Sequence, residues 1–492
     1  MLDALKNEVN YTRTENGALT LESTGSYCLD LFATIGATRS LSEKEIINRF
    51  IPAFTEDRDL AVKILFYARD VRGGLGERRA FRTVLRWLAE NEQETVRKNI
   101  GRIAEYGRYD DLLTLFDTPV EADMLSYVKE RLMADVEAAG SGKEISLLAK
   151  WLPSVNTSSK DAVAYAKRIA RSLGMTDREY RRILVSLRGK IRIIENNLRC
   201  RDYSFDYAKQ PSRAMFKYRQ AFIRNDNERY LEFIDRVERK EAKMHADALY
   251  PYELIAPLID TDFWGCQLTK SISDGERAVL NATWDSLPDY TSDKNCLAIV
   301  DTSGSMYQGK HMPAAVALSL GIYIAEHNKG RFKNCFMEFS ERPKLIELKG
   351  DDFYSKFRYI STFSEIANTN LSAVFNVILS AAVKNGIPKE EMPERLIIIS
   401  DMEFDICVDG GKKTNFEYAR DRYERYGYKL PDIVFWNVDS RHRQQPVTKN
   451  EEGVVLVSGF TPKLYEMVIA GKTPYEFMIE TLTSCRYKDI VA

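Results

Sequence analysis

A carboxylate and two hydroxyls stand at alternate positions in Asp301-x-Ser303-x-Ser305. Residues 296–300, just before them, are apolar and rich in branched side chains, which predicts a buried strand ending at Asp301. A turn follows, and then a predicted helix over residues 313–326 with proline in its first turn. Oxygen atoms at positions i, i+2 and i+4 of such a turn can face one point. This arrangement favours Mg²⁺ or another hard divalent cation.

Two later segments carry more polar groups of this kind. Residues 395–401, Arg-Leu-Ile-Ile-Ile-Ser-Asp, read as a second buried strand that ends in Asp401. Thr369 stands just before an amphipathic helix predicted for residues 371–383. In an open α/β sheet, ligands bind at the carboxyl ends of the strands, so we expect Asp301 and Asp401 at the same edge.

The combination resembles the von Willebrand factor A-type domain. The metal-ion-dependent adhesion site of that family takes Asp-x-Ser-x-Ser from one loop, Thr from a second and Asp from a third. The resemblance implies a metal site made of Asp301, Ser303, Ser305, Thr369 and Asp401. The hydroxyls would ligate directly, the aspartates directly or through water, and a vacant position would accept a carboxylate from a partner.

Other interpretations of the motif are weaker. Asp301 and the serines would also serve as ordinary helix caps. An aspartic protease needs two Asp-Thr/Ser-Gly loops, whereas Ser303 intrudes before Gly304 and residues 400–402 are no second copy. Ser303 has no evident base, since the nearest histidine in sequence is His311. A metal-dependent nuclease would need more carboxylates. We therefore predict no catalytic residue and no enzyme.

Composition bounds the class of protein. The 492 residues predict two to four domains, and 44% hydrophobic and 29% charged residues are ordinary for a globular chain. Seven scattered cysteines without a CxxC pair favour a reducing compartment. No apolar run approaches the ~20 residues of a membrane span, and the N-terminus lacks an apolar signal core. We expect a cytoplasmic protein that does not bind membranes.

The first half predicts helices. Residues 1–26 read as an irregular leader, and residues 27–290 as short helices joined by tight turns, with capping boxes at Ser42-x-x-Glu45 and Thr176-x-x-Glu179. This pattern favours an irregular HEAT-like α-solenoid over a compact bundle. Residues 73–79, Gly-Gly-Leu-Gly-Glu-Arg-Arg, lack the Lys-Ser/Thr of a phosphate loop and read as a helix connector with solvated arginines.

The second half, residues 291–492, alternates strands and helices. We expect a strand pair at 335–339 and 344–348 turning at Pro343, further strands at 432–438 and 454–457, and helices at 416–426, 464–469 and 475–482. The alternation predicts a doubly wound, mostly parallel sheet with helices on both faces.

Residues 160–200 carry eleven Lys or Arg against four Asp or Glu, and more basic residues follow among aromatics such as Phe216 and Phe222. Basic and aromatic side chains together can neutralise phosphates and stack bases. An ordinary solvated helix face, with the aromatics in a core, is the competing interpretation. The predicted RNA-binding residues are Arg178, Arg181, Arg182, Arg188, Lys190, Arg192, Lys209, Arg213, Lys217 and Arg219.

A helical first half followed by an A-type domain resembles the Ro autoantigen family, whose helical-repeat module is called TROVE. It resembles more closely a related, poorly characterised family of bacteria, viruses and plants. The segments that carry this resemblance are residues 66–79, 211–215 and 249–252 and the Asp301 motif. It implies a non-catalytic, monomeric ribonucleoprotein scaffold that binds small structured or misfolded noncoding RNA and holds Mg²⁺ or a similar cation. The alternative is an adaptor that grips protein partners, one of which donates a carboxylate to the metal.

Overall fold

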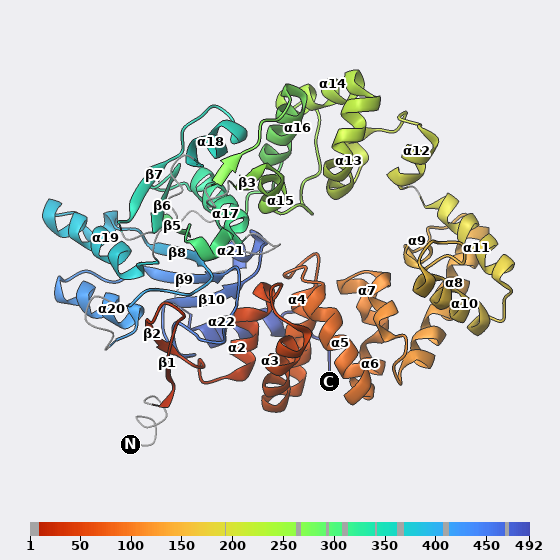
Figure 1. The fold of residues 1–492 in the computed structure, drawn as a ribbon, viewed down its shortest axis with the longest axis horizontal. Coiled ribbons are helices and arrows are strands. Elements are labelled where there is room, and N and C mark those ends of the chain that lie inside the picture. Colours follow the sequence, from red (N-terminus) through yellow and green to blue (C-terminus); the bar gives the residue numbers. More distant parts are fainter. Residues whose placement is uncertain are drawn as a thin grey trace.

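The computed structural model describes residues 9–191, 193–261, 267–291, 295–307, 313–339, 342–361, 369–406, 413–467 and 472–492. A helical region comes first, and a domain built on a mixed, mainly parallel sheet follows it (Figure 1). This is the order that the sequence predicts. In the described residues, no helix is both long enough and apolar enough to cross a membrane.

The helical region begins beside the sheet and runs away from it. Its first helices are α2 (Tyr27–Thr34), α3 (Glu43–Glu56), α4 (Arg58–Arg69), α5 (Arg79–Asn91), α6 (Gln93–Asn99) and α7 (Ile103–Tyr106). Then come α8 (Glu121–Gly140), α9 (Leu148–Trp151), α10 (Lys160–Ser172), α11 (Asp177–Lys190) and α12 (Ile194–Cys200). The last are α13 (Ser212–Asn225), α14 (Asn227–Glu238), α15 (Pro251–Ile255) and α16 (Asp274–Asp285), with a short pair β3 (Ile259–Thr261) and β4 (Gln267–Thr269) between α15 and α16.

The predicted helix starts are present. The Ser42 hydroxyl accepts the backbone N–H of Glu45 at 3.1 Å and opens α3. Thr176 and Glu179 form a full reciprocal capping box at the start of α11, which satisfies two donors that a helix leaves without a partner.

The second domain has a six-stranded sheet in the order β10-β9-β8-β5-β6-β7. Its strands are β5 (Cys296–Asp301), β6 (Cys335–Phe339), β7 (Lys344–Glu347), β8 (Arg395–Ser400), β9 (Asp432–Asn437) and β10 (Val454–Ser458). All neighbours are parallel except β6 and β7, the strand pair predicted around Pro343. The helices are α17 (Pro313–His327), α18 (Phe353–Ile360), α19 (Leu371–Asn385), α20 (Asn415–Arg425), α21 (Lys463–Met467) and α22 (Pro474–Thr483).

Both faces of the sheet are covered, which explains why β5 is apolar throughout. Cys296, Ala298 and Val300 point into the core that contains α17 and the first helices of the chain. Leu297 and Ile299 point into a second core with α19 and α20. Successive side chains of a strand face opposite sides, so a strand buried on both sides shows no polar alternation.

The helices form an arc that leaves the sheet domain through α2–α5, turns at α8–α11 and returns through α13–α16 (Figure 1). At the first end, the N–H of Gly36 donates to the Ser458 hydroxyl at 3.0 Å, so close that a Cβ at Gly36 would lie 2.5 Å from the Ser458 carbonyl oxygen. At the other end, Arg277 of α16 donates to Asp352 at 2.8 Å and Trp284 to Glu326 at 2.7 Å. The sheet domain therefore closes the arc.

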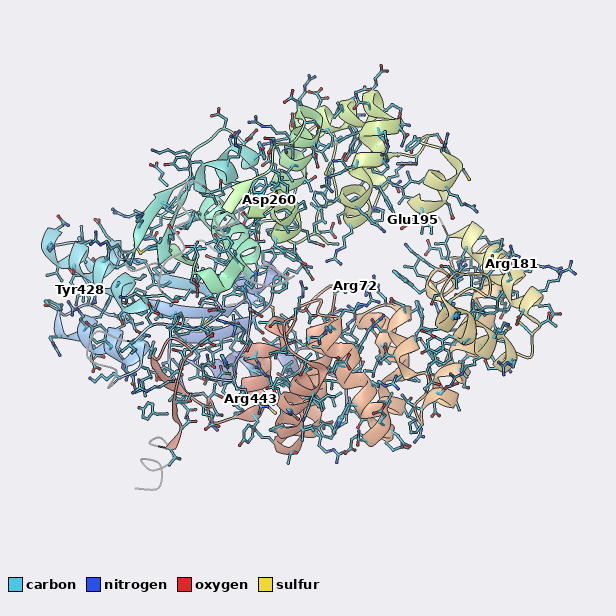
Figure 2. The ribbon with its side chains drawn as sticks, in the orientation of Figure 1. Arg72, Arg181, Glu195, Asp260, Tyr428 and Arg443 are labelled. Atoms are coloured by element: carbon cyan, nitrogen blue, oxygen red, sulfur yellow. The ribbon has the colours of Figure 1, made fainter. Side chains whose placement is uncertain are left out.

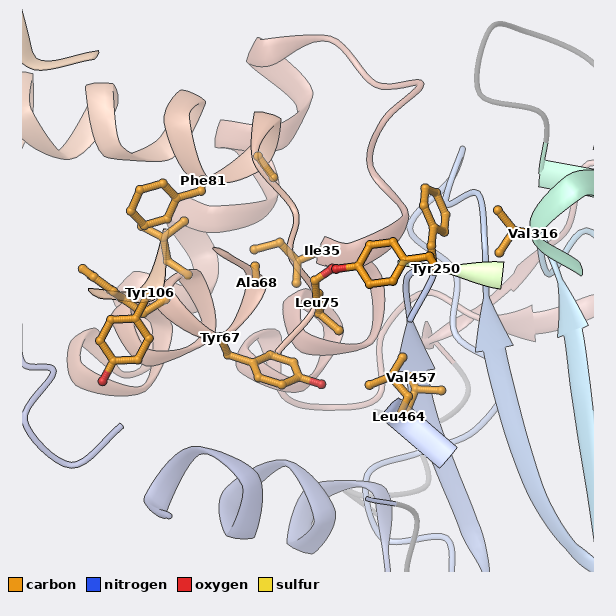
Figure 3. Packing of buried hydrophobic residues seen from close by; sticks show 14 of the residues in the cluster. Ile35, Tyr67, Ala68, Leu75, Phe81, Tyr106, Tyr250, Val316, Val457 and Leu464 are labelled. Carbon is orange, nitrogen blue, oxygen red and sulfur yellow. The ribbon is translucent and has the colours of Figure 1, made fainter. Parts of the chain in front are cut away.

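A continuous core crosses the junction between the two regions. Figure 3 shows Tyr67, Leu75 and Tyr250 of the helical region near Val457 and Leu464 of the sheet domain, and all five belong to one buried cluster. The helical region and the sheet domain are therefore packed as one body at this junction.

The prediction of an irregular leader is wrong for the part that the structure describes. Strands β1 (Tyr11–Arg13) and β2 (Leu19–Leu21) form an antiparallel hairpin. The hairpin packs on the sheet domain rather than on the helices that follow it, because Leu21 pairs with Gln445 and Gly17 bridges Asp405. Strands of three residues carry too little periodicity to be recognised in a sequence.

Candidate functional site

The carboxyl ends of β5 and β8 bring the predicted carboxylates together. These central strands are parallel neighbours, with Val300 opposite Ile399, so Asp301 and Asp401 leave the sheet at the same edge. Asp301 is fully buried, and Asp401 is 2% exposed. The sequence expectation that they share one edge is met.

Hydroxyl groups connect the two carboxylates. The Ser305 hydroxyl donates to Asp401 Oδ2 at 2.7 Å, and the Ser303 and Ser305 hydroxyl oxygens lie 3.1 Å apart. Asp301 accepts the N–H of Ser303 at 2.9 Å and the hydroxyl of Ser400 at 2.5 Å. We name Asp301, Ser303, Ser305 and Asp401 the carboxylate–hydroxyl cluster.

Thr369, the remaining predicted ligand, is buried as well. Its hydroxyl accepts the side-chain amide of Asn16 at 3.1 Å, and its carbonyl accepts the N–H of Asp405 at 2.9 Å. The bond to Asp405 ties Thr369 to the segment that follows Asp401. The contacts of Thr369 thus place it at the same edge of the sheet, against the β1–β2 hairpin.

Two buried carboxylates in this space disfavour each other's charge. Burial, and then the charge of Asp401, raise the pKa of Asp301 to about 7. Burial also raises the pKa of Asp401, although Arg441 and Ser305 act against that shift. Arg441 donates to Asp401 Oδ2 at 2.8 Å and pairs with Glu15 of the hairpin at 2.7 Å. The Arg441 guanidinium therefore pairs with two carboxylates, one in the cluster and one in the hairpin.

The chemistry of this cluster fits a hard divalent cation. Its potential ligand atoms are all oxygens, two of them hydroxyls 3.1 Å apart, and Arg441, which pairs with Asp401, is itself shared with Glu15. A bound cation would favour the charged form of both carboxylates. Ser303, Ser305, Asp301 and Asp401 could hold such an ion, whereas the contacts of Thr369 are with Asn16 and Asp405.

Sequence reasoning missed the groups that surround the cluster. Glu403, 1% exposed, accepts the N–H of Glu15 at 2.7 Å, lies 2.7 Å from His442 Nδ1 and accepts the Gln444 amide at 2.6 Å. Asn16 donates to the carbonyl of Glu403 at 2.6 Å. Glu15 and Asn16 lie almost 400 residues from Glu403, and nothing local in the sequence pairs them.

The predicted RNA-binding residues divide into two groups. Arg178, Arg181 and Arg182 are exposed on α11, and Arg181 points outward from the arc (Figure 2). Arg188, by contrast, donates to the carbonyls of Ala149 and Leu152 and to the Ser154 hydroxyl, at 2.6–2.7 Å. Burial lowers its pKa. Lys190 donates to the carbonyl of Ala139. The side chains of Arg188 and Lys190 therefore donate hydrogen bonds to backbone carbonyls of neighbouring segments.

The basic residues near α13 divide in the same way. Lys209, Arg213 and Lys217 are exposed, although Arg213 also donates to the Ala248 carbonyl at 2.8 Å and pairs with Glu253 at 3.6 Å. Arg219 stacks 4.1 Å from the Phe216 ring and pairs with Glu276 at 3.4 Å. Arg192 lies outside the described residues. Three of the aromatic side chains interleaved with them are core residues, because Tyr207, Phe216 and Phe222 are each at most 9% exposed, and Tyr218 is half-buried. These three rings are not accessible for stacking on a base.

Two protein-family models match the chain, one over the helical region and one over the sheet domain. Residues 14–131 and 109–297 match the family model described as "Domain of unknown function (DUF2828)". The chain belongs to the DUF2828 family. Residues 295–482 match a second model, "Domain of unknown function (DUF7788)". This DUF2828 protein is 29% identical over 516 residues to an uncharacterized protein of Acanthamoeba polyphaga mimivirus. The alignment covers 96% of this chain and 87% of the viral protein.

Among solved structures, the crystal structure of the Deinococcus radiodurans RO (RSR) protein is similar to this DUF2828 protein with a TM-score of 0.41 and 13% identity. The match covers 96% of this chain and 95% of that chain.

Proposed function

We propose that this protein is a non-catalytic RNA-binding scaffold with a divalent-cation site. In this proposal the helical arc is an irregular, HEAT-like solenoid, and the sheet domain is of the von Willebrand factor A type. The ligands would be small structured or misfolded noncoding RNAs, as the Ro-like sequence pattern implies, and the protein would act as a cytoplasmic monomer.

The observation that supports RNA binding most is the exposed arginine group of α11. Within the described part of the chain, Arg178, Arg181 and Arg182 make no ion pair within 4.0 Å, and their side chains face solvent. Lys209, Arg213 and Lys217 add exposed basic groups beyond α12. Guanidinium groups that the fold does not use can bind phosphate oxygens and release counterions, which drives nucleic-acid binding.

The proposed cation is Mg²⁺. Ser303, Ser305 and Thr369 would hold it through hydroxyls, and Asp301 and Asp401 would hold it directly or through water. Once bound, the ion supplies a coordination position for an acidic group of a partner.

Binding of a labelled RNA hairpin with a single-stranded tail tests the proposal. We expect the logarithm of the association constant to fall linearly with the logarithm of salt concentration. Co-purified nucleic acid, followed as the ratio of absorbance at 260 and 280 nm before and after a salt wash, provides a second measurement. Absent or salt-insensitive binding of this RNA would contradict RNA recognition.

A second candidate function is protein binding at the cation site. The hairpin supports it, because Glu15 and Asn16 already bring a polypeptide loop against Arg441, Glu403 and Thr369. A partner segment with an acidic side chain would use the same edge. Loss of a protein partner on Asp301→Ala, with RNA binding unchanged, would favour this adaptor over the scaffold.

A further inference from the structure

A cavity of about 800 Å³ lies between α3, α5 and the turn that precedes α5. Five arginines and a tryptophan contribute to its lining: Arg39, Arg78, Arg79, Arg82, Arg86 and Trp87. We name it the arginine cavity. It shares no lining residue with the carboxylate–hydroxyl cluster or with the exposed arginine group of α11.

Helix α5 arranges its arginines in a row. Arg79, Arg82 and Arg86 stand at positions i, i+3 and i+7, which lie on one face of a helix and span about 10 Å along its axis. Phe81 and Leu85 lie on the opposite face, in the core. The pattern is that of a helix whose polar face carries a line of guanidinium groups beside open space.

The positive charge around the start of the cavity exceeds the negative charge that the protein provides. Asp110 and Asp111, in the short helix η3 (Tyr109–Leu115), are shared by Arg69, Arg78, Arg82 and Arg108. Burial and the charge of Arg82 lower the pKa of Arg78. Glu43, Glu77 and Glu90 also line the cavity, and Glu77 pairs with Arg39 and Glu90 with Arg86. Seven arginines in and beside the cavity therefore face five carboxylates, which leaves a small net positive charge.

Buried polar atoms without a well-oriented hydrogen-bond partner of both kinds lie there, and the acceptor among them is Oδ1 of Asp110. Buried Nη2 of Arg82 and Nε of Arg108 lack a hydrogen-bond acceptor, although each lies within 3.2 Å of an Asp110 oxygen, because the geometry is unsuitable. At the start of α5, the Arg79 N–H already donates to the buried Glu77 carboxylate at 3.2 Å, so an anionic group already occupies this helix end. An incoming oxyanion would meet donors already in place.

Trp87 gives the cavity a second kind of contact. It is half-buried and packs edge-on to Phe50 and Phe54, with ring centroids 5.8 and 6.1 Å away, which fixes its orientation. A planar base can stack on a held indole ring, and phosphates can bind a row of arginines. An acidic peptide would use the arginines without needing the ring.

We propose that the arginine cavity binds nucleotide units, with phosphates along Arg79, Arg82 and Arg86 and a base against Trp87. This inference rests on the proposed RNA-binding function and gives it a specific site, away from the basic residues that the sequence indicates. The same chemistry is offered by the end of a single strand and by a free nucleotide.

The test measures fluorescence anisotropy of a labelled oligouridylate of about ten nucleotides on the full-length protein. Arg86→Glu is the test variant and Arg102→Glu the matched control, since both arginines are similarly exposed and each pairs with a glutamate one helical turn further along the chain. We expect Arg86→Glu to weaken binding about tenfold or more and Arg102→Glu less than twofold. Trp87→Leu should weaken it about fivefold or more, and Trp87→Phe clearly less.

Competition identifies the source of the nucleotide. Displacement by uridine monophosphate at millimolar concentration indicates a free nucleotide, and displacement by unlabelled oligomer alone indicates a strand; either supports the site.

Equal losses in the Arg86 and Arg102 variants would overturn the arginine cavity while leaving RNA binding intact. Displacement by oligoglutamate, with Trp87→Leu unchanged, would reassign the cavity to acidic peptides. Absence of any oligouridylate binding at low salt would remove the cavity proposal, and if the tailed hairpin also fails to bind, RNA recognition falls with it.

Discussion

The carboxylate–hydroxyl cluster and the arginine group of α11 are held in opposite ways. At the cluster, polar side chains of separate segments contact one another, as Ser305 does with Asp401 and Arg441 with both Asp401 and Glu15. On α11, Arg178 and Arg181 extend into solvent from one helix. A buried polar group must be satisfied by partners that the fold supplies, whereas an exposed charge is satisfied by water.

Substitutions in the two regions should therefore be detected by different measurements. A substitution at the cluster disturbs several segments at once, so stability and ion binding should change together. A substitution on α11 should leave folding alone and change only the binding of a charged partner. Arg188, on the same helix but turned inward, lets the two kinds be compared within one element.

The largest expected effect is on cation binding. Asp301→Ala removes one of the two buried carboxylates, and we expect Mg²⁺ affinity to fall about 100-fold or more, measured by titration calorimetry. In the wild-type protein, a chelator should lower the melting temperature, and it should have no such effect on the variant. Wild-type Mg²⁺ affinity in Asp301→Ala would mean that the cluster is a structural network alone.

The charge of Asp301 also predicts a pH dependence for the metal-free protein. Its pKa of about 7 in the folded state lies above the ordinary aspartate value of 3.8. Its contribution to stability is therefore fully present below pH 3.8 and is lost as the pH rises through 7. Asp301→Asn should remove that loss, so the difference in unfolding free energy between pH 5 and pH 8, measured by urea denaturation, should shrink. An unchanged difference would mean that Asp301 is charged throughout this range.

Next in size is the loss of Arg188. Arg188→Ala leaves three acceptors on Ala149, Leu152 and Ser154 without their donor, and we expect a loss of about 2–4 kcal/mol in unfolding free energy. Arg181→Ala is the matched control on the same helix and should change stability by less than about 0.5 kcal/mol. Equal effects in urea denaturation would remove the contrast between the inward and outward arginines.

A smaller change is expected for RNA affinity. A triple variant in which glutamine replaces Arg178, Arg181 and Arg182 should bind the tailed RNA about tenfold more weakly. The slope of the logarithm of the association constant against the logarithm of salt concentration should also fall in magnitude by about 1–2, because fewer phosphates are neutralised. Circular dichroism and the melting temperature should match wild type. Unchanged affinity would move the RNA interface away from α11.

The smallest effect concerns the hairpin. Asn16→Ala removes donors to the Thr369 hydroxyl and the Glu403 carbonyl, and we expect about 1–2 kcal/mol of destabilisation, confined to the hairpin. Hydrogen exchange should become faster in residues 9–23 and stay the same in α11. Faster exchange throughout the chain would show that the hairpin supports the whole fold.

Much of the sheet domain was predictable because its signals are local. Six buried or paired strands are short apolar runs bounded by turns, and the predicted helices at 371–383 and 416–426 match α19 and α20 within a residue or two. The pairing of Asp301 with Asp401 followed from a general rule about parallel sheets. The hairpin and the role of Arg441 were not predictable, since they depend on contacts across hundreds of residues.

The basic stretch shows the same limit at the level of side chains. Spacing placed Arg178, Arg181, Arg182 and Arg188 near one helical face, yet only the tertiary neighbours of α11 separate the exposed three from the inward one. Likewise, the spacing of Phe216 and Phe222 fits either core residues or a surface that stacks on bases, and in the structure both rings are packed in the core. The arginines of residues 78–86 read as a helix connector followed by a helix, and only the fold encloses a cavity beside them.

By itself the sequence determined the local elements, the order of the two regions and the ends of the strands that carry Asp301 and Asp401. These depend on periodicity and capping, which neighbouring residues decide among themselves. Tertiary structure alone decided which charges are buried, which are paired and which face solvent. The physical reason is that burial and pairing are set by side chains distant in the sequence, and only the folded chain brings those together.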